Sequence, residues 1–211
     1  HIEPTIVQAL PFQNIMLEKL SYQLIGLSQG LKSPFVTAAF QDSRGYFWFG
    51  GRRGLTRYDG QTFYFYPFVN EGQHRGIGAI TEDLEGNLWM SFSSFGGLMK
   101  FDGHDFYEYQ EGAGLELGED YLGILHSDKQ GNVWLKSETK IIRFDGDNFT
   151  CFPYQFQNLQ NLNIIIKENE RGEFWCSALG GVCFLKGEQM KYYAIEGQFE
   201  NNLCHPIIED E

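Results

Sequence analysis

Apolar and polar positions along the chain follow one pattern that occurs four times. In each copy an apolar run ends at a polar turn, usually Asp-x-x-Gly, and a short apolar run with a tryptophan follows. A glycine-marked reversal leads to a third run, and an Asp-Gly turn leads to a fourth, aromatic-rich run in the first three copies. The four tryptophans are Trp48, Trp89, Trp134 and Trp175, so successive copies lie 41, 45 and 41 residues apart.

Each copy has the length of one β-propeller blade, about 40–50 residues. In the second copy the apolar runs predict strands at 77–81, 88–91 and 106–109, with a further strand before the Asp-Gly turn. Strict polar/apolar alternation is weak, as expected for sheets that neighbouring blades cover on both faces. We therefore predict an all-β fold, a β-propeller of four-stranded antiparallel blades with about four blades present. A β-sandwich, the alternative, would not require this repeat.

Several residues recur at fixed places in the repeat and are predicted to be structural. A residue that occurs once in each blade usually serves its turn, through positive φ or side-chain bonds to backbone N–H groups. The recurring turn residues are Gly45, Gly86, Gly131 and Gly172, then Asp59, Asp102 and Asp145. For the same reason Asp42, Asp83 and Asp128 are not predicted to be catalytic carboxylates.

The repeat also predicts the domain limits. Blades are expected at about 31–68, 76–112, 120–154 and 161–196, after an N-terminal extension at 1–19. Residues 20–30 have the pattern of a strand that completes a closing blade, and 203–211 restart the first-strand pattern of a further blade. The propeller region, 20–211, is thus expected to be part of a larger ring. Because bare blade faces need a cover, we also expect self-association, with two four-blade halves forming an eight-blade ring.

The pattern D-x-x-G-x-x-W followed by G-L-x-R-[FY]-D-G-x-x-F resembles the two-component regulator propeller repeat, over roughly residues 20–211. The sialidase-type Asp box differs, since it has one residue between Asp and Gly where these turns have two. The resemblance implies a periplasmic sensor region of an inner-membrane histidine kinase or hybrid two-component system. It implies further propeller blades and downstream signalling domains as partners.

Composition narrows the choice of partners. The net charge is −12, from 16 basic and 28 acidic residues, which argues against nucleic acid because phosphate binding needs a basic surface. The four cysteines show no metal-ligand spacing, and no metal or cofactor is predicted. Cys176 and Cys183 flank the reversal of the fourth copy, where apolar packing is favoured over a disulfide.

No catalytic constellation emerges from the sequence. Residues 26–30 match G-x-S-x-G, but a nucleophile elbow needs a helix to follow, and Ser33-Pro34 comes next instead. The histidines form no cluster with metal-ligand spacing. The segment is therefore predicted to be non-catalytic itself.

Ligand recognition is expected on the second reversal of each blade and on the links between blades, which project at the same end of a propeller. The candidate residues there are Arg52, Arg53, His74, Arg75, Phe95 and Tyr121. The basic ones suit a carboxylate or sulfate group, and the aromatic ones suit a sugar ring. For each of them taken singly, the simpler interpretation is a solvated loop residue. The resemblance to the two-component regulator propeller repeat implies that the function is sensing of a small-molecule or oligosaccharide ligand. The alternatives are a secreted propeller enzyme of lyase type and a passive binding or adhesion module.

Overall fold

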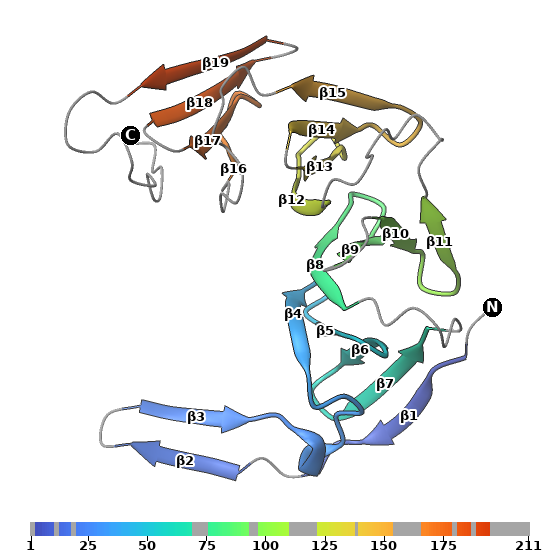
Figure 1. Cartoon of the computed structure of the whole chain (residues 1–211). Helices are drawn as coiled ribbons and strands as arrows, with labels where there is room; N and C mark the ends of the chain where they lie inside the picture. Colours follow the sequence, from blue (N-terminus) through green and yellow to red (C-terminus); the bar gives the residue numbers. More distant parts are fainter. Residues whose placement is uncertain are drawn as a thin grey trace.

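The computed structural model describes residues 3–10, 13–17, 20–68, 76–92, 97–109, 122–137, 139–153, 166–178, 181–186 and 189–194. Within these ranges the chain forms four large antiparallel sheets, one two-stranded hairpin and a short 3-10 helix (Figure 1). The prediction of an all-β fold built from four-stranded antiparallel blades is confirmed.

The first sheet, blade 1, has five strands in the order β1-β7-β6-β5-β4. Its strands are β1 (Thr5–Gln8), β4 (Val36–Gln41), β5 (Phe47–Gly51), β6 (Gly54–Tyr58) and β7 (Thr62–Pro67). Four of them form the meander that the repeat predicts. The fifth, β1, pairs antiparallel with β7 at the outer edge of the blade.

The other three sheets each have four strands in sequence order. Blade 2 contains β8 (Ile77–Glu82), β9 (Leu88–Phe92), β10 (Leu98–Phe101) and β11 (Phe106–Tyr109). Blade 3 contains β12 (Gly123–Ser127), β13 (Val133–Lys136), β14 (Lys140–Phe144) and β15 (Phe149–Pro153). Blade 4 contains β16 (Ile166–Glu168), β17 (Phe174–Ala178), β18 (Gly181–Lys186) and β19 (Gln189–Ala194).

The four sheets follow an arc that is open on one side (Figure 1). Their first strands lie along the inner side of this arc, where β4 contacts β8, β8 contacts β12 and β12 contacts β16. This is the arrangement of blades around a propeller axis, with the first strand of each blade nearest the axis.

The N-terminal segment contributes one strand to blade 1 and forms a separate hairpin. Residues 20–24 form β3 (Leu20–Leu24), which pairs with β2 (Gln13–Leu17) in a hairpin that projects from the blade 1 end of the arc (Figure 1). Residues 5–8 of the expected extension form β1. Local pairing explains the hairpin, because a neighbouring run closes the shortest loop and loses the least chain entropy. A closing blade at 20–30 stays a prediction, and 203–211 lie outside the described residues.

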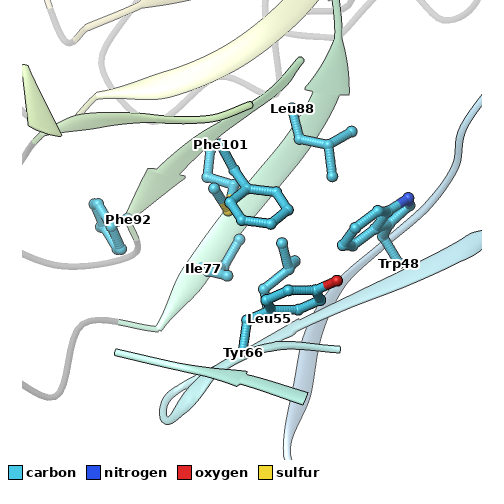
Figure 2. Packing of buried hydrophobic residues seen from close by; sticks show 8 residues of the cluster. Trp48, Leu55, Tyr66, Ile77, Leu88, Phe92 and Phe101 are labelled. Atoms are coloured by element: carbon cyan, nitrogen blue, oxygen red, sulfur yellow. The ribbon is translucent and has the colours of Figure 1, made fainter. Parts of the chain in front are cut away.

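Neighbouring blades pack face to face, and we call each such interface a seam. The blade face that carries the tryptophan is its trailing face, and the opposite face is its leading face. In seam 1–2 the trailing residues Trp48, Leu55 and Tyr66 are buried against Ile77, Leu88, Met90, Phe92 and Phe101 of blade 2 (Figure 2). In seam 2–3 the residues Trp89, Leu98 and Tyr109 pack with Leu122, Val133, Leu135, Ile142 and Phe144.

Aromatic contacts repeat from seam to seam. The Trp48 ring meets the Phe101 ring edge-on at a centroid distance of 5.9 Å, and Trp89 meets Phe144 in the same way at 5.2 Å. Trp134 lies 4.6 Å from Phe174 of blade 4. Each tryptophan of the first three blades is thus buried by the blade that follows it, which explains why one tryptophan occurs in each copy.

The two cysteines of blade 4 lie opposite each other in the backbone register of the strands that flank the reversal. Cys176 on β17 and Cys183 on β18 are partners in the strand register. Cys183 is buried, as expected of a cysteine that packs as a small apolar side chain.

Candidate functional site

The meander topology divides the propeller into two ends with different chemistry. Because successive strands are antiparallel, the turn after the first strand and the turn after the third strand lie at one end, which we call the turn end. The turn after the second strand lies at the opposite end. There each fourth strand also finishes and the next blade begins, for example at Pro67 and Ile77. We call this the loop end.

At the turn end, buried aspartates close the first turn of blades 1 to 3. The Asp42 carboxylate accepts from the backbone N–H groups of Arg44 and Tyr46, at 3.1 and 2.8 Å, and from Nε1 of Trp48 at 2.8 Å. Asp83 and Asp128 make the same bonds within their own turns. The turn glycines have the positive φ that the turn requires, 88° at Gly45 and 73–89° in the other three blades.

Blade 4 has an asparagine in place of this aspartate. The Asn169 Oδ1 accepts from the N–H groups of Arg171 and Glu173, at 3.0 and 2.9 Å. Its Nδ2 donates to the Glu173 carboxylate at 3.0 Å. An amide nitrogen cannot accept a hydrogen bond, so the bond to the tryptophan Nε1 does not recur at Trp175.

A second set of aspartates closes the turn after the third strand. Asp102 accepts from the N–H groups of His104 and Asp105, both at 2.8 Å, and Asp59 and Asp145 repeat the arrangement. The backbone N–H groups of Asp105 and His104 lower the pKa of Asp102. The pKa of Asp145 is lowered by the N–H groups of Asn148 and Asp147. The aspartates of the turn end therefore serve their own turns, as the sequence predicts for residues that recur in each blade.

Glutamates at the end of a first strand connect some blades. The Glu82 carboxylate of blade 2 accepts from the backbone N–H and the hydroxyl of Ser43 in blade 1, at 2.7 and 3.0 Å. Glu168 of blade 4 accepts from the backbone N–H of Lys129 in blade 3 at 3.1 Å. Blade 3 has Ser127 at this position, and its buried hydroxyl oxygen has no partner in the described part of the chain.

The loop end carries the first two of the predicted ligand residues. Arg52 and Arg53 are both exposed on the tight reversal between β5 and β6. A Cβ on Gly51 would lie 2.6 Å from the Phe35 carbonyl oxygen, and one on Gly54, with φ of 150°, would contact the Tyr66 carbonyl oxygen. The N–H of Phe68 donates to the Arg53 carbonyl at 3.1 Å. This packing fixes the backbone that presents the two arginines.

The other predicted ligand residues are His74, Arg75, Phe95 and Tyr121, which lie outside the described residues. The structure therefore brings Arg52 and Arg53 together on one turn and leaves the convergence of all six as a prediction.

Lys136 is a loop-end residue that the sequence reasoning did not select. It ends β13 and is the register partner of Gly123, and its aliphatic carbons lie 3.3–3.9 Å from the place of a Cβ on that glycine. Burial lowers the pKa of the Lys136 ammonium. The sequence could have indicated Lys136, because the matching residues of the other copies are Gly50, Ser91 and Ser177. Blade 3 thus has a lysine where the other blades have a small residue.

Among the described residues, no group of three or more His, Cys, Asp or Glu side chains is arranged to hold a metal ion. No helix among them is long and apolar enough to span a membrane.

Comparison with known proteins places the chain in the propeller class first. It superposes on catalytically inactive virginiamycin B lyase from Staphylococcus aureus with quinupristin, with a TM-score of 0.66 and 16% identity, over 85% of this chain and 61% of the lyase. It also superposes on apo AztD from Citrobacter koseri, with a TM-score of 0.57 and 10% identity, over 85% of this chain and 50% of AztD. At these identities the likeness shows the fold alone.

Two further matches are more specific than the propeller fold. Residues 30–53 match the two component regulator propeller family. The extracellular domain of BT3049 from B. thetaiotaomicron, described as a hybrid two component system, superposes with a TM-score of 0.60 and 23% identity, over 80% of this chain and 24% of that one. No curated protein matches. The chain thus carries a match to the two component regulator propeller repeat at residues 30–53. It shares its fold with the extracellular domain of a hybrid two component system and spans about a quarter of that domain.

Proposed function

We propose that this chain is the ligand-sensing part of an extracytoplasmic propeller sensor in a two-component signalling system. The observation that carries the proposal is the two component regulator propeller repeat at residues 30–53, on a propeller fold that is also found in the extracellular domain of such a system. The repeat ends on the turn of Arg52 and Arg53. The receptor around it would be anchored in the inner membrane and would contain a histidine kinase.

The chemistry of the two ends supports binding at the loop end. At the turn end the aspartates already accept bonds from their own backbone and, in three blades, from a tryptophan. At the loop end two exposed guanidinium groups stand on a fixed turn of an acidic protein. Arginine gives bidentate hydrogen bonds to planar anions. The ligand class that fits is an oligosaccharide or small molecule with a carboxylate or sulfate group.

The proposal is tested by thermal unfolding of the chain with acidic oligosaccharides, such as uronic-acid or sulfated ones, and with neutral oligosaccharides of equal length. A ligand at a hundred times its Kd stabilises the folded state by about 2.7 kcal/mol, which raises Tm by roughly 5–10 °C for a chain of this size. The double variant Arg52→Ala/Arg53→Ala should lose this shift. Arg171→Ala, an exposed arginine at the turn end, is the matched control and should retain it.

Two results would contradict the proposal. One is an equal shift for the double variant and the wild-type chain, which would place binding elsewhere. The other is cleavage of the oligosaccharide by the chain, detected by a change in its mass, which would favour a propeller enzyme of lyase type. A passive adhesion module would bind without transmitting a signal. A fusion of the intact receptor's sensor region to a reporter kinase would separate that case.

A further inference from the structure

The two blades at the ends of the arc each have one face that no described residue of the chain covers fully. On the leading face of blade 1, Val36 is 42% exposed and Phe47 is 43% exposed. The repeat places Val36 at the position of Ile77 and Leu122, and Phe47 at the position of Leu88 and Val133. All four of those residues are at most 1% exposed. Positions that are buried in the internal seams are therefore bare at this end.

The opposite end of the arc shows the complementary face. On the trailing face of blade 4, Tyr193 is 49% exposed. Its counterparts Tyr66 in blade 1 and Phe152 in blade 3 are 5% and 6% exposed. Trp175 contacts Phe184 and Tyr193 of its own sheet, at centroid distances of 4.6 and 6.2 Å. This face has the tryptophan and tyrosine that the internal seams bury.

The chain itself covers only part of the leading face of blade 1. Tyr58 and Phe63, in the outer half of the blade, are buried with Leu31 from the N-terminal segment. Among the described residues none covers the inner half in this way, where Val36 and Phe47 lie, and Phe35 beside it is 66% exposed. Leu27, in the short helix of the covering segment, is exposed as well. The exposed apolar residues thus continue from the bare half onto the segment.

We infer that the occupant of this leading face is the trailing face of blade 4 in a second copy of the chain. Two copies would join head to tail, so that each contributes one leading and one trailing face. The contact would repeat the internal seams, which are already established in the same fold. A head-to-tail contact produces a closed ring when its rotation closes, and eight blades is within the range that propellers adopt.

The polar residues at the turn end fit this pairing. In the internal seams the residue that ends a first strand lies against the first turn of the preceding blade, as Glu82 does with Ser43 and Glu168 does with Lys129. In the head-to-tail contact Gln41 would lie against Glu170, and both are exposed. A neutral amide accepts the Glu170 backbone N–H without the like-charge repulsion that a glutamate at position 41 would add.

The test is the mass of the chain in solution, by light scattering and sedimentation equilibrium at tens of micromolar. We expect twice the 24.3 kDa of one chain. Phe47→Glu and Tyr193→Glu each place a charge in the contact and should each weaken association by at least about tenfold. Both positions are half exposed within one chain, so the folded state should persist, which circular dichroism would verify. Ile6→Glu changes an apolar side chain on β1 that is 63% exposed, and this control should remain dimeric.

Mixing the two charged variants provides the sharper test. In a head-to-tail pair, a Phe47→Glu chain keeps a normal trailing face and a Tyr193→Glu chain keeps a normal leading face. The mixture therefore has one unaltered contact and should form a dimer where neither variant does alone. A monomeric wild-type chain would overturn the inference and assign both faces to blades elsewhere in the parent protein. A wild-type dimer without rescue on mixing would overturn the head-to-tail arrangement, and mass that grows beyond two copies would overturn the two-copy ring.

Discussion

Seams 1–2 and 2–3 bury similar aromatic and aliphatic side chains, yet they differ at the turn end. In seam 1–2 the Glu82 carboxylate crosses between blades and accepts two bonds from Ser43. In seam 2–3 its place is taken by Ser127, whose hydroxyl oxygen is buried and unpaired within the described residues. There an apolar contact replaces the charge, since Leu84 of blade 2 lies 3.3 Å from the place of a Cβ on Gly131.

The difference shows that the repeat specifies the apolar part of a seam more strictly than its polar part. The apolar cores of seams 1–2 and 2–3 use the same repeat positions. The carboxylate links are particular to seams 1–2 and 3–4. Seam 2–3 should therefore be the easiest place for the arc to open. Four predictions test this comparison.

The largest effect is expected from removal of a turn aspartate. Asp128→Ala leaves the buried Trp134 Nε1 without its acceptor and frees two backbone N–H groups, which should cost about 3 kcal/mol. The turn also presents the Lys129 N–H to Glu168. Asp83→Ala makes a matched comparison, because the turn of Asp83 faces seam 2–3, where Ser127 stands in place of a glutamate and accepts no bond from that turn among the described residues. Chemical denaturation should show the larger loss for Asp128→Ala, and equal losses would contradict a role for the link.

Changes at the repeat position that ends the first strand should have different effects in the two seams. Glu82→Gln keeps the shape but removes the charge that accepts from Ser43, at a cost of about 1 kcal/mol. Ser127→Ala removes a buried hydroxyl that has no partner among the described residues, and it should leave stability unchanged or slightly higher. Urea unfolding of both variants measures the two values. A clear loss for Ser127→Ala would mean that its hydroxyl is paired in solution.

A carboxylate bond between blades 2 and 3 can also be introduced by substitution. Ser127→Glu places a carboxylate where it can accept from the Leu84 backbone N–H, as Glu82 does from Ser43. We expect a gain of up to about 1 kcal/mol, since such bonds at an exposed edge are partly screened, or a rise in Tm of roughly 2–4 °C. Hydrogen exchange should slow in strands β8 and β12 on either side of seam 2–3. Slower exchange confined to blade 1 would argue against the placement.

The smallest effect concerns the aspartates that lie away from both seams. The folded-state pKa of Asp102 is lowered by the N–H groups of Asp105 and His104. Its contribution to stability is therefore present above the unfolded-state pKa, near 3.9, and is lost as the pH falls through the lower folded-state pKa. Because the group is exposed, the contribution should stay below about 0.5 kcal/mol. Asp102→Asn should flatten this part of the pH–stability curve without changing either seam.

Much of the fold could be predicted from the sequence because the signal is repeated. Trp48, Trp89, Trp134 and Trp175 mark the second strands, and the turn glycines mark the ends of the first. The hairpin of β2 and β3 could not be predicted in this way, since it occurs once and its pairing depends on chain proximity. The polar contacts between blades could not be predicted either. The repeat aligns Glu82 with Ser127, but only the folded structure shows that the Glu82 carboxylate accepts from the first turn of the preceding blade.

The candidate site was less predictable than the fold. Arg52 and Arg53 stand out because two cations lie between glycines on a predicted reversal. Lys136 does not, since its burial depends on the space above Gly123, which only the folded backbone defines. The residues that match Lys136 in the other blades are Gly50, Ser91 and Ser177. Alignment of the repeats therefore shows that blade 3 has a large cation where the other blades have small side chains.

The four tryptophans should differ in their fluorescence, because their indole rings differ in hydrogen bonding and in exposure. In blades 1 to 3 the indole Nε1 donates to an aspartate, and each of these rings is at most 6% exposed. In blade 4 the Asn169 amide directs its nitrogen at Glu173 instead, and the Trp175 ring is only partly buried. The emission of Trp175 should therefore lie to the red of the other three. A fluorescence spectrum can then distinguish loosening of the last blade from loosening of the whole arc, with no external dye.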